Sequence, residues 1–264
     1  MEFEAQSSWP VRVSVMTFNV WGNDRWPERK DALQETVRRH RPDVLYLQEV
    51  TPQILQAITE VLPSHKYVVD SNFKGWSTEC NIVWNNDLLE KTKHEFVDAM
   101  GFEDNPHRGL FTALLRVRSN PQITFAALTV HFPWPGCPAE LRTGMNQRAL
   151  IADKIVGFTG DGSDQAMPFI LAGDFNESFH PQRILRDAGY EDVFSEVGVP
   201  PPVTHPVRSA SQRESSMPPQ ALDWIMIRGS GMRVLTASAV DVRGPDLSSD
   251  HLPVVTVVEL GRAE

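Results

Sequence analysis

The sequence predicts an α/β protein with mixed sheets, flanked by helices and built as one large domain. Near the N-terminus, apolar strand-like runs alternate with helix-like segments. In the middle of the chain, strand-like runs follow one another with little helix between them, which is typical of antiparallel neighbours. Candidate site residues occur near residue 19 and again near residue 251, so both ends of the chain contribute to one site. The two halves are compatible with a two-sheet β-sandwich.

The N-terminal half is expected to open as strand, helix, strand and helix. Residues 11–18 alternate apolar and polar side chains and predict a strand that ends at Asn19. A helix is expected to begin at Pro27 and to end before Pro42, and a buried strand then leads to Glu49. Pro52 begins a second helix. The strands expected next cover residues 66–70, 80–84, 110–117 and 123–130.

The second half is expected to contain two more helices and four strands. Helical spacing predicts one helix over 139–158, and a helix over 181–189 is expected to end at Gly189. Residues 198–220 are rich in Pro and Ser and predict a long irregular loop of the kind that is usually functional or mobile. The expected strands are 168–175, 222–227, 233–240 and 253–260.

Composition describes an ordinary globular chain, with 41% hydrophobic and 22% charged residues among 264. The net charge of -9 argues against a broad basic surface for polyanions, although carboxylates that bind a metal are counted in that charge. Two cysteines, Cys80 and Cys137, are too few for a disulfide framework and are expected to be reduced, with a single bridge between them as the alternative. We expect an N-terminal tail over 1–10, a single domain over 11–260, and a monomeric cytoplasmic protein without stable membrane insertion.

Polar residues occur along the chain at the ends of apolar runs. The ends of strands in a sheet protein deliver side chains to a shared pocket, so these residues are expected to meet. Carboxylates and carboxamides are the ligands of a hard divalent cation, which favours Mg²⁺ with Mn²⁺ as a substitute, and histidines remain for phosphate and proton transfer. The motifs are TFNV with Asn19, LQEV with Glu49, TVHF with His131, GDFN with Asp174 and Asn176, LDW with Asp223, and SDHLPV with Asp250 and His251.

In this order and spacing, the motifs resemble the endonuclease/exonuclease/phosphatase family from about residue 13 to 258. The resemblance implies a four-layer, DNase I-like fold, in which two sheets are flanked by helices. It implies a metal-dependent phosphoric ester hydrolase that acts by in-line attack of water. Asn19, Glu49 and Asp250 then correspond to the metal site, Asp174 to the residue that aligns or deprotonates the water, and Asn176 to its phosphate-binding or metal-binding neighbour.

The resemblance also implies roles for two histidines. His251 corresponds to the histidine that contacts the scissile phosphate, and Asp223 to the residue that orients it. His131 matches the deoxyribonuclease and sphingomyelinase pattern and differs from the abasic endonucleases, which have a tyrosine there. Glu79 corresponds to the carboxylate that pairs with this second histidine. An imidazole needs such a partner to hold its tautomer.

Substrate choice is expected to lie in the loops. Arg108, Trp134 and His205 are candidate substrate-binding residues, and Phe132 and Trp76 are expected at the rim of the pocket. The aromatic residues could stack on bases, meet lipid or pack on prolines. Three further polar residues, Arg142, Gln147 and Arg148, could contact phosphate or lie on a solvated helix face.

The leading hypothesis is a Mg²⁺-dependent phosphodiesterase that acts on nucleic-acid ends or nucleotide-derived esters. An inositol-phosphate phosphatase or a sphingomyelinase-like phospholipase is the alternative within the same family. A catalytically inactive binding module is the alternative of another class.

Overall fold

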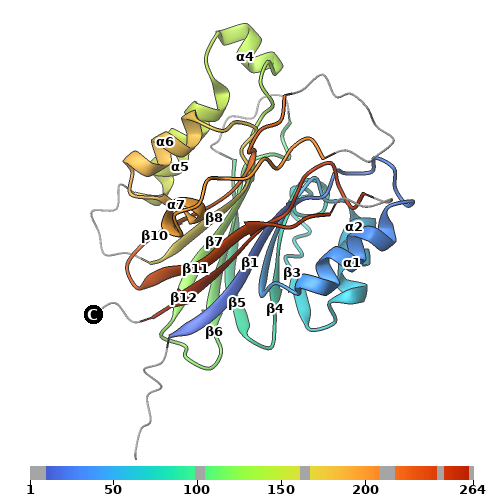
Figure 1. Ribbon diagram of the computed structural model, residues 1–264, viewed down its shortest axis with the longest axis vertical. Coiled ribbons are helices and arrows are strands. Elements are labelled where there is room, and N and C mark those ends of the chain that lie inside the picture. The colour runs from blue at the N-terminus through green and yellow to red at the C-terminus, as the bar shows by residue number, and fades with distance from the viewer. Residues whose placement is uncertain (1–9, 99–104, 161–166, 208–217, 243–246, 262–264) are drawn as a thin grey trace, which may run out of the picture.

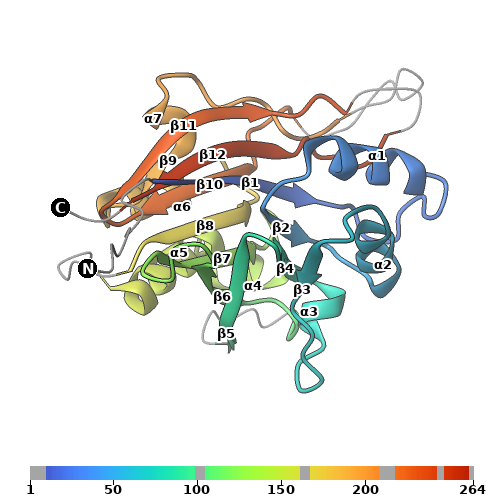
Figure 2. The same cartoon turned by 90° about the horizontal axis from the view of Figure 1, so that it is seen from below.

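Two mixed sheets pack face to face, and helices cover the outer face of each (Figures 1 and 2). The computed structural model describes residues 10–98, 105–160, 167–207, 218–242 and 247–261. The expected N-terminal tail, apart from Pro10, lies outside the described residues. The four-layer arrangement confirms the fold that the sequence and its family resemblance predict.

Each sheet has six strands and contains one parallel pair. In spatial order, the first sheet consists of β11 (Met232–Ala239), β12 (Val254–Leu260), β1 (Val11–Asn19), β2 (Val44–Gln48), β4 (Cys80–Asn85) and β3 (His65–Tyr67). The second consists of β5 (Leu89–Val97), β6 (Leu110–Val117), β7 (Thr124–His131), β8 (Phe169–Asp174), β10 (Asp223–Arg228) and β9 (Glu191–Asp192). β1 runs parallel to β2, and β7 runs parallel to β8.

The helices form the two outer layers. α1 (Lys30–His40) and α2 (Pro52–Val61) pack on the first sheet through a core that includes Phe18 and Ile54. α5 (Gln147–Thr159) and α6 (His180–Asp187) pack on the second sheet through a core that includes Val130 and Ile155. The described residues also form three shorter helices, α3 (Gly75–Thr78), α4 (Pro138–Thr143) and α7 (Val193–Glu196), of which α4 projects from the body in Figure 1. None of the helices described is long and apolar enough to cross a membrane.

The space between the sheets changes from apolar to polar along the strands. In β1, Val13 and Val15 belong to the central core, and by the period of two Thr17 and Asn19 share their face. β7 repeats this pattern, because Phe125 and Ala127 lie in the same core and Thr129 and His131 follow on the same face. Each strand therefore carries its last polar residue to one shared end of the sandwich.

A buried polar layer separates the apolar core from that end. The Gln48 amide donates to Thr129 Oγ1 (2.9 Å), and Thr17 Oγ1 donates to Gln48 Oε1 (3.3 Å). The contact between Gln48 and Thr129 joins the two sheets, and the contact with Thr17 holds the Gln48 amide in place, so the strand ends above them are held together. Gly173 lets β7 and β8 approach closely, since a Cβ there would lie 2.0 Å from the Val130 carbonyl oxygen.

Several predicted elements differ from the structure. The first helix begins at Lys30 rather than Pro27, after a turn. The helix expected over 139–158 is two helices, because Gly144 adopts a left-handed conformation (φ 68°) and Asn146 caps the next helix through the Ala149 N–H. β5 was not predicted, because its sequence LEKTKHEFV is largely polar, as suits an edge strand.

Candidate active site

The site lies at the polar end of the sandwich, where both parallel strand pairs end. In register, Asn19 faces Gln48 across β1 and β2, and His131 faces Asp174 across β7 and β8. Asp223, the first residue of the antiparallel β10, pairs with Asp174 from the other side. The polar residues that the sequence singles out are therefore brought together from both sheets.

Asn19 connects the two sheets within the site. Its Nδ2 donates to Glu49 Oε1 (3.1 Å) and to Asp174 Oδ2 (3.0 Å). Its Oδ1 accepts the Trp21 backbone N–H (3.0 Å), and this fixes which end of the amide faces the carboxylates. In this arrangement Asn19 holds Glu49 and Asp174 together through its nitrogen, whereas the sequence predicts an oxygen ligand for a metal.

The two ring nitrogens of His131 differ in their surroundings: Nδ1 has a close carboxylate partner, and Nε2 has none within hydrogen-bond distance among the described residues. Its Nδ1 is 2.9 Å from Glu79 Oε1, and Arg108 Nε donates to the same oxygen (2.8 Å). Burial raises the pKa of Glu79, but His131 and Arg108 outweigh it, and the pKa is lowered overall. On the other side of the ring, His131 Nε2 lies 3.6 Å from Asp174 Oδ2 and 3.8 Å from Glu49 Oε1.

His251 has the same arrangement on the other side of Asp174. Its Nδ1 is 2.8 Å from Asp223 Oδ2, and its Nε2 is 3.8 Å from Asp174 Oδ2. Burial lowers the pKa of His251, but the carboxylates of Asp223, Asp174 and Asp250 outweigh it and raise the pKa to about 10. The three carboxylates therefore favour the protonated form of the ring in the absence of a metal ion.

The distances divide into two classes. Nδ1 of each ring is close enough to a carboxylate oxygen for a hydrogen bond, at 2.9 Å for His131 and 2.8 Å for His251. On the opposite side of each ring, Nε2 is 3.6 to 3.8 Å from a carboxylate oxygen, which is too long for a hydrogen bond. Such spacing leaves room for a third group, such as a water, an ion or a phosphate oxygen, between imidazole and carboxylate.

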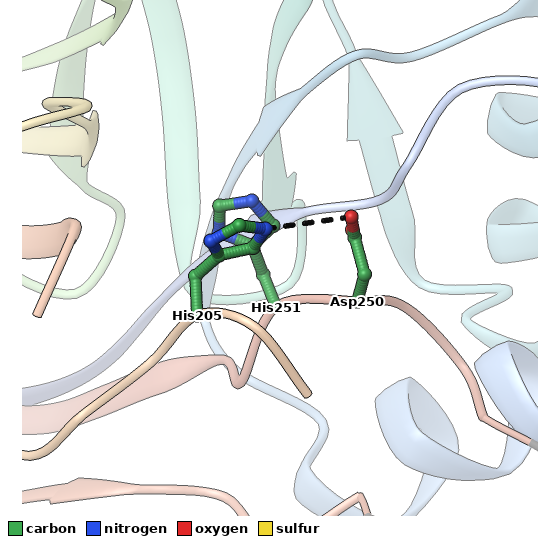
Figure 3. Close-up of side chains that lie close together, drawn as sticks. All are labelled: His205, Asp250 and His251. Carbon is green, nitrogen blue, oxygen red and sulfur yellow. Dashed lines mark ion pairs between the residues drawn. The ribbon is translucent and has the colours of Figure 1, made fainter. Parts of the chain in front are cut away.

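Asp250 and His205 form the third side of the site (Figure 3). The His205 ring lies against the His251 ring, with centroids 4.4 Å apart, and its Nε2 is 3.7 Å from Asp250 Oδ2. Burial raises the pKa of Asp250, but the two histidines outweigh it, and the pKa is lowered. His205 thus lies within the site, on the described part of the long irregular loop.

Two residues that follow strand ends have unusual backbone conformations. Glu49 follows β2 with φ 57°, and Asn176 lies just beyond β8 with φ 50°. A non-glycine residue in this region is uncommon and costs about 1 kcal/mol or more. Asn176 is held there by its backbone N–H, which donates to Asp174 Oδ1 (2.8 Å), and by its side-chain amide, which donates to the Phe132 carbonyl (2.8 Å).

Three further residues hold the site loops in place, a role that the sequence analysis assigned to none of them. Arg29 is buried and donates to the carbonyls of Trp21, Gly22, Asp24 and Ser248, and so joins the loop after β1 to the segment before Asp250. Burial lowers the pKa of Arg29 to about 10, although nearby carboxylates, that of Asp250 first, oppose the shift. Its backbone-directed contacts carry no recognisable sequence signal.

Ser249 and Thr204 are the other two. Ser249 Oγ donates to the Asn19 carbonyl (2.7 Å) and accepts the His251 N–H (3.1 Å). Thr204 Oγ1 accepts the N–H groups of Leu222 (2.9 Å) and Asp223 (3.1 Å). A serine or threonine beside a motif residue was the only available signal, and it is too common to be specific.

The candidate substrate-binding residues differ in position. Trp134 follows β7 and is 53% exposed, as a rim residue should be, and Arg108 lies next to Glu79. Phe132 and Trp76 were expected at the rim, and this was wrong. Phe132 is buried against Phe175, and Trp76 is buried against Phe111, because both occupy core-facing positions.

Arg148 is a structural residue rather than a phosphate contact. Its buried guanidinium binds Glu177 (2.7 Å) and Glu140 (2.7 Å), and so joins α4 and the loop after β8 at the start of α5. Gln147 donates to Thr143 Oγ1, within the turn between α4 and α5. Cys80 and Cys137 are both buried and free.

The donor set fits a hard divalent cation. Carboxylates at the site outnumber the arginines near them, and a buried carboxylate oxygen, Asp223 Oδ1, has no hydrogen-bond partner among the described residues. Within the described part of the chain, two groups offer ligand atoms within 4.8 Å of one another, His205 with Asp250 and His251, and Asp174 with Asp223 and His251. Oxygen-rich ligands of this kind suit a cation that neutralises the excess negative charge.

The fold and site together define a metal-dependent phosphoric ester hydrolase. The sequence pattern of the Endonuclease/Exonuclease/phosphatase family matches residues 16–251, and the chain belongs to this family. Among curated protein sequences, none matches the chain.

Solved structures of the same fold cover nearly the whole chain. TDP2 from D. rerio, complexed with a single-strand DNA product, has a TM-score of 0.76 at 16% identity, over 94% of this chain and 98% of that chain. An endonuclease/exonuclease/phosphatase from Bacteroides vulgatus has a TM-score of 0.73 at 20% identity, over 95% and 99%. The human nocturnin catalytic domain, with a bound sulfate anion, has a TM-score of 0.68 at 19% identity, over 95% and 94%.

Proposed function

We propose that this protein is a Mg²⁺-dependent phosphodiesterase that hydrolyses esters at nucleic-acid ends or in nucleotide-derived compounds by in-line attack of water. One observation supports the proposal above all others. His131 and His251 each have a carboxylate behind them, and both turn Nε2 toward Asp174 across gaps of 3.6 and 3.8 Å. A phosphoryl group placed in these gaps would meet donors on two sides.

The cation would be held by Glu49 and Asp250, with Asn19 supporting Glu49. When bound, it neutralises charge that develops on the phosphoryl oxygens and the leaving oxygen. Its binding would also relieve the excess negative charge of the site. The remaining chemistry belongs to the side chains of the chain itself.

Asp174 would orient the attacking water and accept its proton. Asn19 and the Asn176 N–H each donate to one of its oxygens, and these bonds fix the carboxylate plane. As the water oxygen bonds to phosphorus, the bond to the leaving oxygen breaks, the leaving group takes up a proton from solvent, and Asp174 then returns its proton to solvent. Substrate and product thus differ by one water.

His131 and His251 would donate hydrogen bonds to the non-bridging oxygens, where negative charge grows during the displacement. Glu79 and Asp223 bind the opposite ring nitrogens and so keep the two Nε2–H groups directed at the substrate. Asn176 would add a donor next to them through its second amide hydrogen. Donors of this kind are worth roughly 3 to 4 kcal/mol each when removed singly.

For the substrate, an exposed aromatic residue and a modest number of cations favour a strand end over a long duplex. Trp134 is available to stack on a base, and Arg108 is available beside Glu79 for a phosphate. The net charge of -9 does not suit a protein that grips duplex DNA along its length. The single-strand DNA product in the D. rerio TDP2 structure is consistent with this choice.

The test is a substrate panel with purified protein and Mg²⁺. It contains bis-p-nitrophenyl phosphate, p-nitrophenyl phosphate, single- and double-stranded DNA, RNA, a 5′-tyrosyl oligonucleotide, sphingomyelin and an inositol phosphate. We expect chelator-sensitive cleavage of the diester and of single-stranded ends. Release of phosphate from monoesters alone, or cleavage of sphingomyelin alone, would overturn the proposal.

Matched variants keep the panel interpretable. Asp174→Asn removes the charge at the site and should abolish cleavage, whereas Asp153→Asn removes an exposed carboxylate on α5 and should leave it unchanged. Equal activity in both variants would point to a contaminating hydrolase.

A further inference from the structure

We propose that His205 is a nitrogen ligand of the cation site, together with Asp250, and that it strengthens the binding of Mn²⁺ more than that of Mg²⁺. This inference rests on the proposed function for the presence of a cation, and it adds a ligand from the long loop. His205 comes from the segment between α7 and β10, whereas Asp250 precedes β12, so the cation would join two loops.

The spacing of the two residues suits a shared ion. His205 Nε2 and Asp250 Oδ2 are 3.7 Å apart, beyond hydrogen-bond reach (Figure 3). Two ligands placed about 2.1 Å from one ion lie roughly 3.0 Å apart at a right angle and roughly 4.2 Å apart when opposite. The observed separation falls between these limits. His251 also offers a ligand atom within 4.8 Å of both.

His205 lacks the partners that a buried imidazole ordinarily has. Its side chain is 12% exposed, and its Nδ1 is buried without a hydrogen-bond partner in the described part of the chain. Among the described residues, its Nε2 has no contact closer than the long approach to Asp250. Burying polar nitrogens without partners is costly, so the ring gains stability from a ligand at this position.

The ring is nevertheless held firmly. It lies against the His251 ring, and the backbone of His205 pairs with Gln220 in both directions (3.1 and 2.8 Å). The preceding Thr204 accepts two backbone N–H groups from the start of β10. A rigid ring with unsatisfied nitrogens next to a carboxylate has the features of a preformed ligand.

A nitrogen ligand strengthens the binding of some ions more than that of others. Mg²⁺ is bound almost entirely through oxygen and keeps several waters, whereas Mn²⁺ accepts imidazole nitrogen as well as oxygen. Without His205, the donor set of Glu49 and Asp250 would be all oxygen. With it, the site becomes a mixed nitrogen and oxygen site.

The test measures bound Mn²⁺ directly, without substrate. Electron spin-echo spectroscopy of the full chain loaded with Mn²⁺ should show a coupling to ¹⁴N, and the coupling should weaken or vanish in His205→Phe, which keeps a planar ring against His251. By titration, the Kd for Mn²⁺ should rise about tenfold or more in this variant. The Kd for Mg²⁺ should change less than about threefold.

The control is His40→Phe, which removes an exposed imidazole at the end of α1 and should change neither the coupling nor the affinities. Circular dichroism establishes that each variant is folded, and His205→Gln provides a second variant if His205→Phe is not. Absence of ¹⁴N coupling in the wild-type protein, or unchanged Mn²⁺ affinity in a folded His205 variant, would overturn the inference. Neither measurement needs activity, so a failed substrate panel leaves this result readable.

Discussion

His131 and Asp174 lie side by side at the ends of the parallel strands β7 and β8, yet their side chains do not hydrogen bond. Nε2 and Oδ2 are 3.6 Å apart, although register places the two residues directly opposite one another. Each side chain is instead held from elsewhere, His131 by Glu79 and Asp174 by Asn19 and Asn176. The open gap is therefore maintained by surrounding contacts and is available to a substrate group.

If Glu79 positions His131, removing its charge should slow the reaction. We expect Glu79→Gln to lower kcat by about tenfold to a hundredfold on bis-p-nitrophenyl phosphate, with a smaller effect on KM, because a misdirected ring fails mainly in the transition state. Steady-state kinetics measure this. Glu90→Gln, which breaks an exposed pair with Arg116, is the control, and an unchanged kcat in a folded Glu79→Gln protein would show that the contact only stabilises the fold.

Glu49 should be indispensable if it holds the cation. We expect Glu49→Ala to lower turnover by at least about a hundredfold while the fold is retained, because Glu49 is partly exposed and contributes little to the core. Activity titrated against Mg²⁺ should also require a higher concentration. Wild-type turnover in the folded variant would remove Glu49 from the metal site.

Alternating side chains made the main part of the fold predictable. In β1 the run from Val13 to Asn19 assigns one face to the core and continues that face into the site, and the same rule applies to Asp174 in β8. Because the sequence motifs sit at such positions, their meeting at one end of the sandwich follows from the period of a strand. The strand β5 was not predicted, because it lies at the edge of its sheet and an edge strand can be largely polar.

Contacts between side chain and backbone could not be predicted in this way. Arg29 and Thr204 act on carbonyl and N–H groups, which every residue possesses, so the sequence contains no partner to recognise. The pairing of Glu79 with His131 rested on family resemblance, because loop geometry decides whether residues 52 positions apart can touch. The prediction for Phe132 was wrong for a different reason. It was expected at the rim because it follows His131, but successive residues of a strand point to opposite faces, and Phe132 is buried in the core on the other face.

The hydroxyl of Thr204 should matter for both stability and catalysis. Thr204→Val keeps the shape but leaves two buried N–H groups without an acceptor, which should cost about 1 to 3 kcal/mol in the free energy of unfolding. Since one of these groups belongs to Asp223, the variant should also lower kcat. Thr204→Ser retains the hydroxyl and should recover most of both losses, as urea unfolding and kinetics would show; equal losses in Val and Ser variants would assign the effect to packing.

Glu177 should make the stability of the protein depend on pH in the acidic range. Burial raises its pKa, but Asn146, Arg148 and His180 outweigh it and lower the pKa from 4.5 to about 2. A depressed pKa in the folded state means that the contribution is complete above the unfolded pKa near 4.5 and is lost as the pH falls through about 2. It should amount to at most about 3 kcal/mol.

The difference in unfolding free energy between wild type and Glu177→Gln should therefore be largest above pH 5 and should shrink on acidification, as urea unfolding at pH 7, 5, 4 and 3 would show. The exposed Glu90→Gln variant should show little such change, and a Glu177→Gln difference that stays constant with pH would mean that the charge of Glu177 does not contribute to stability.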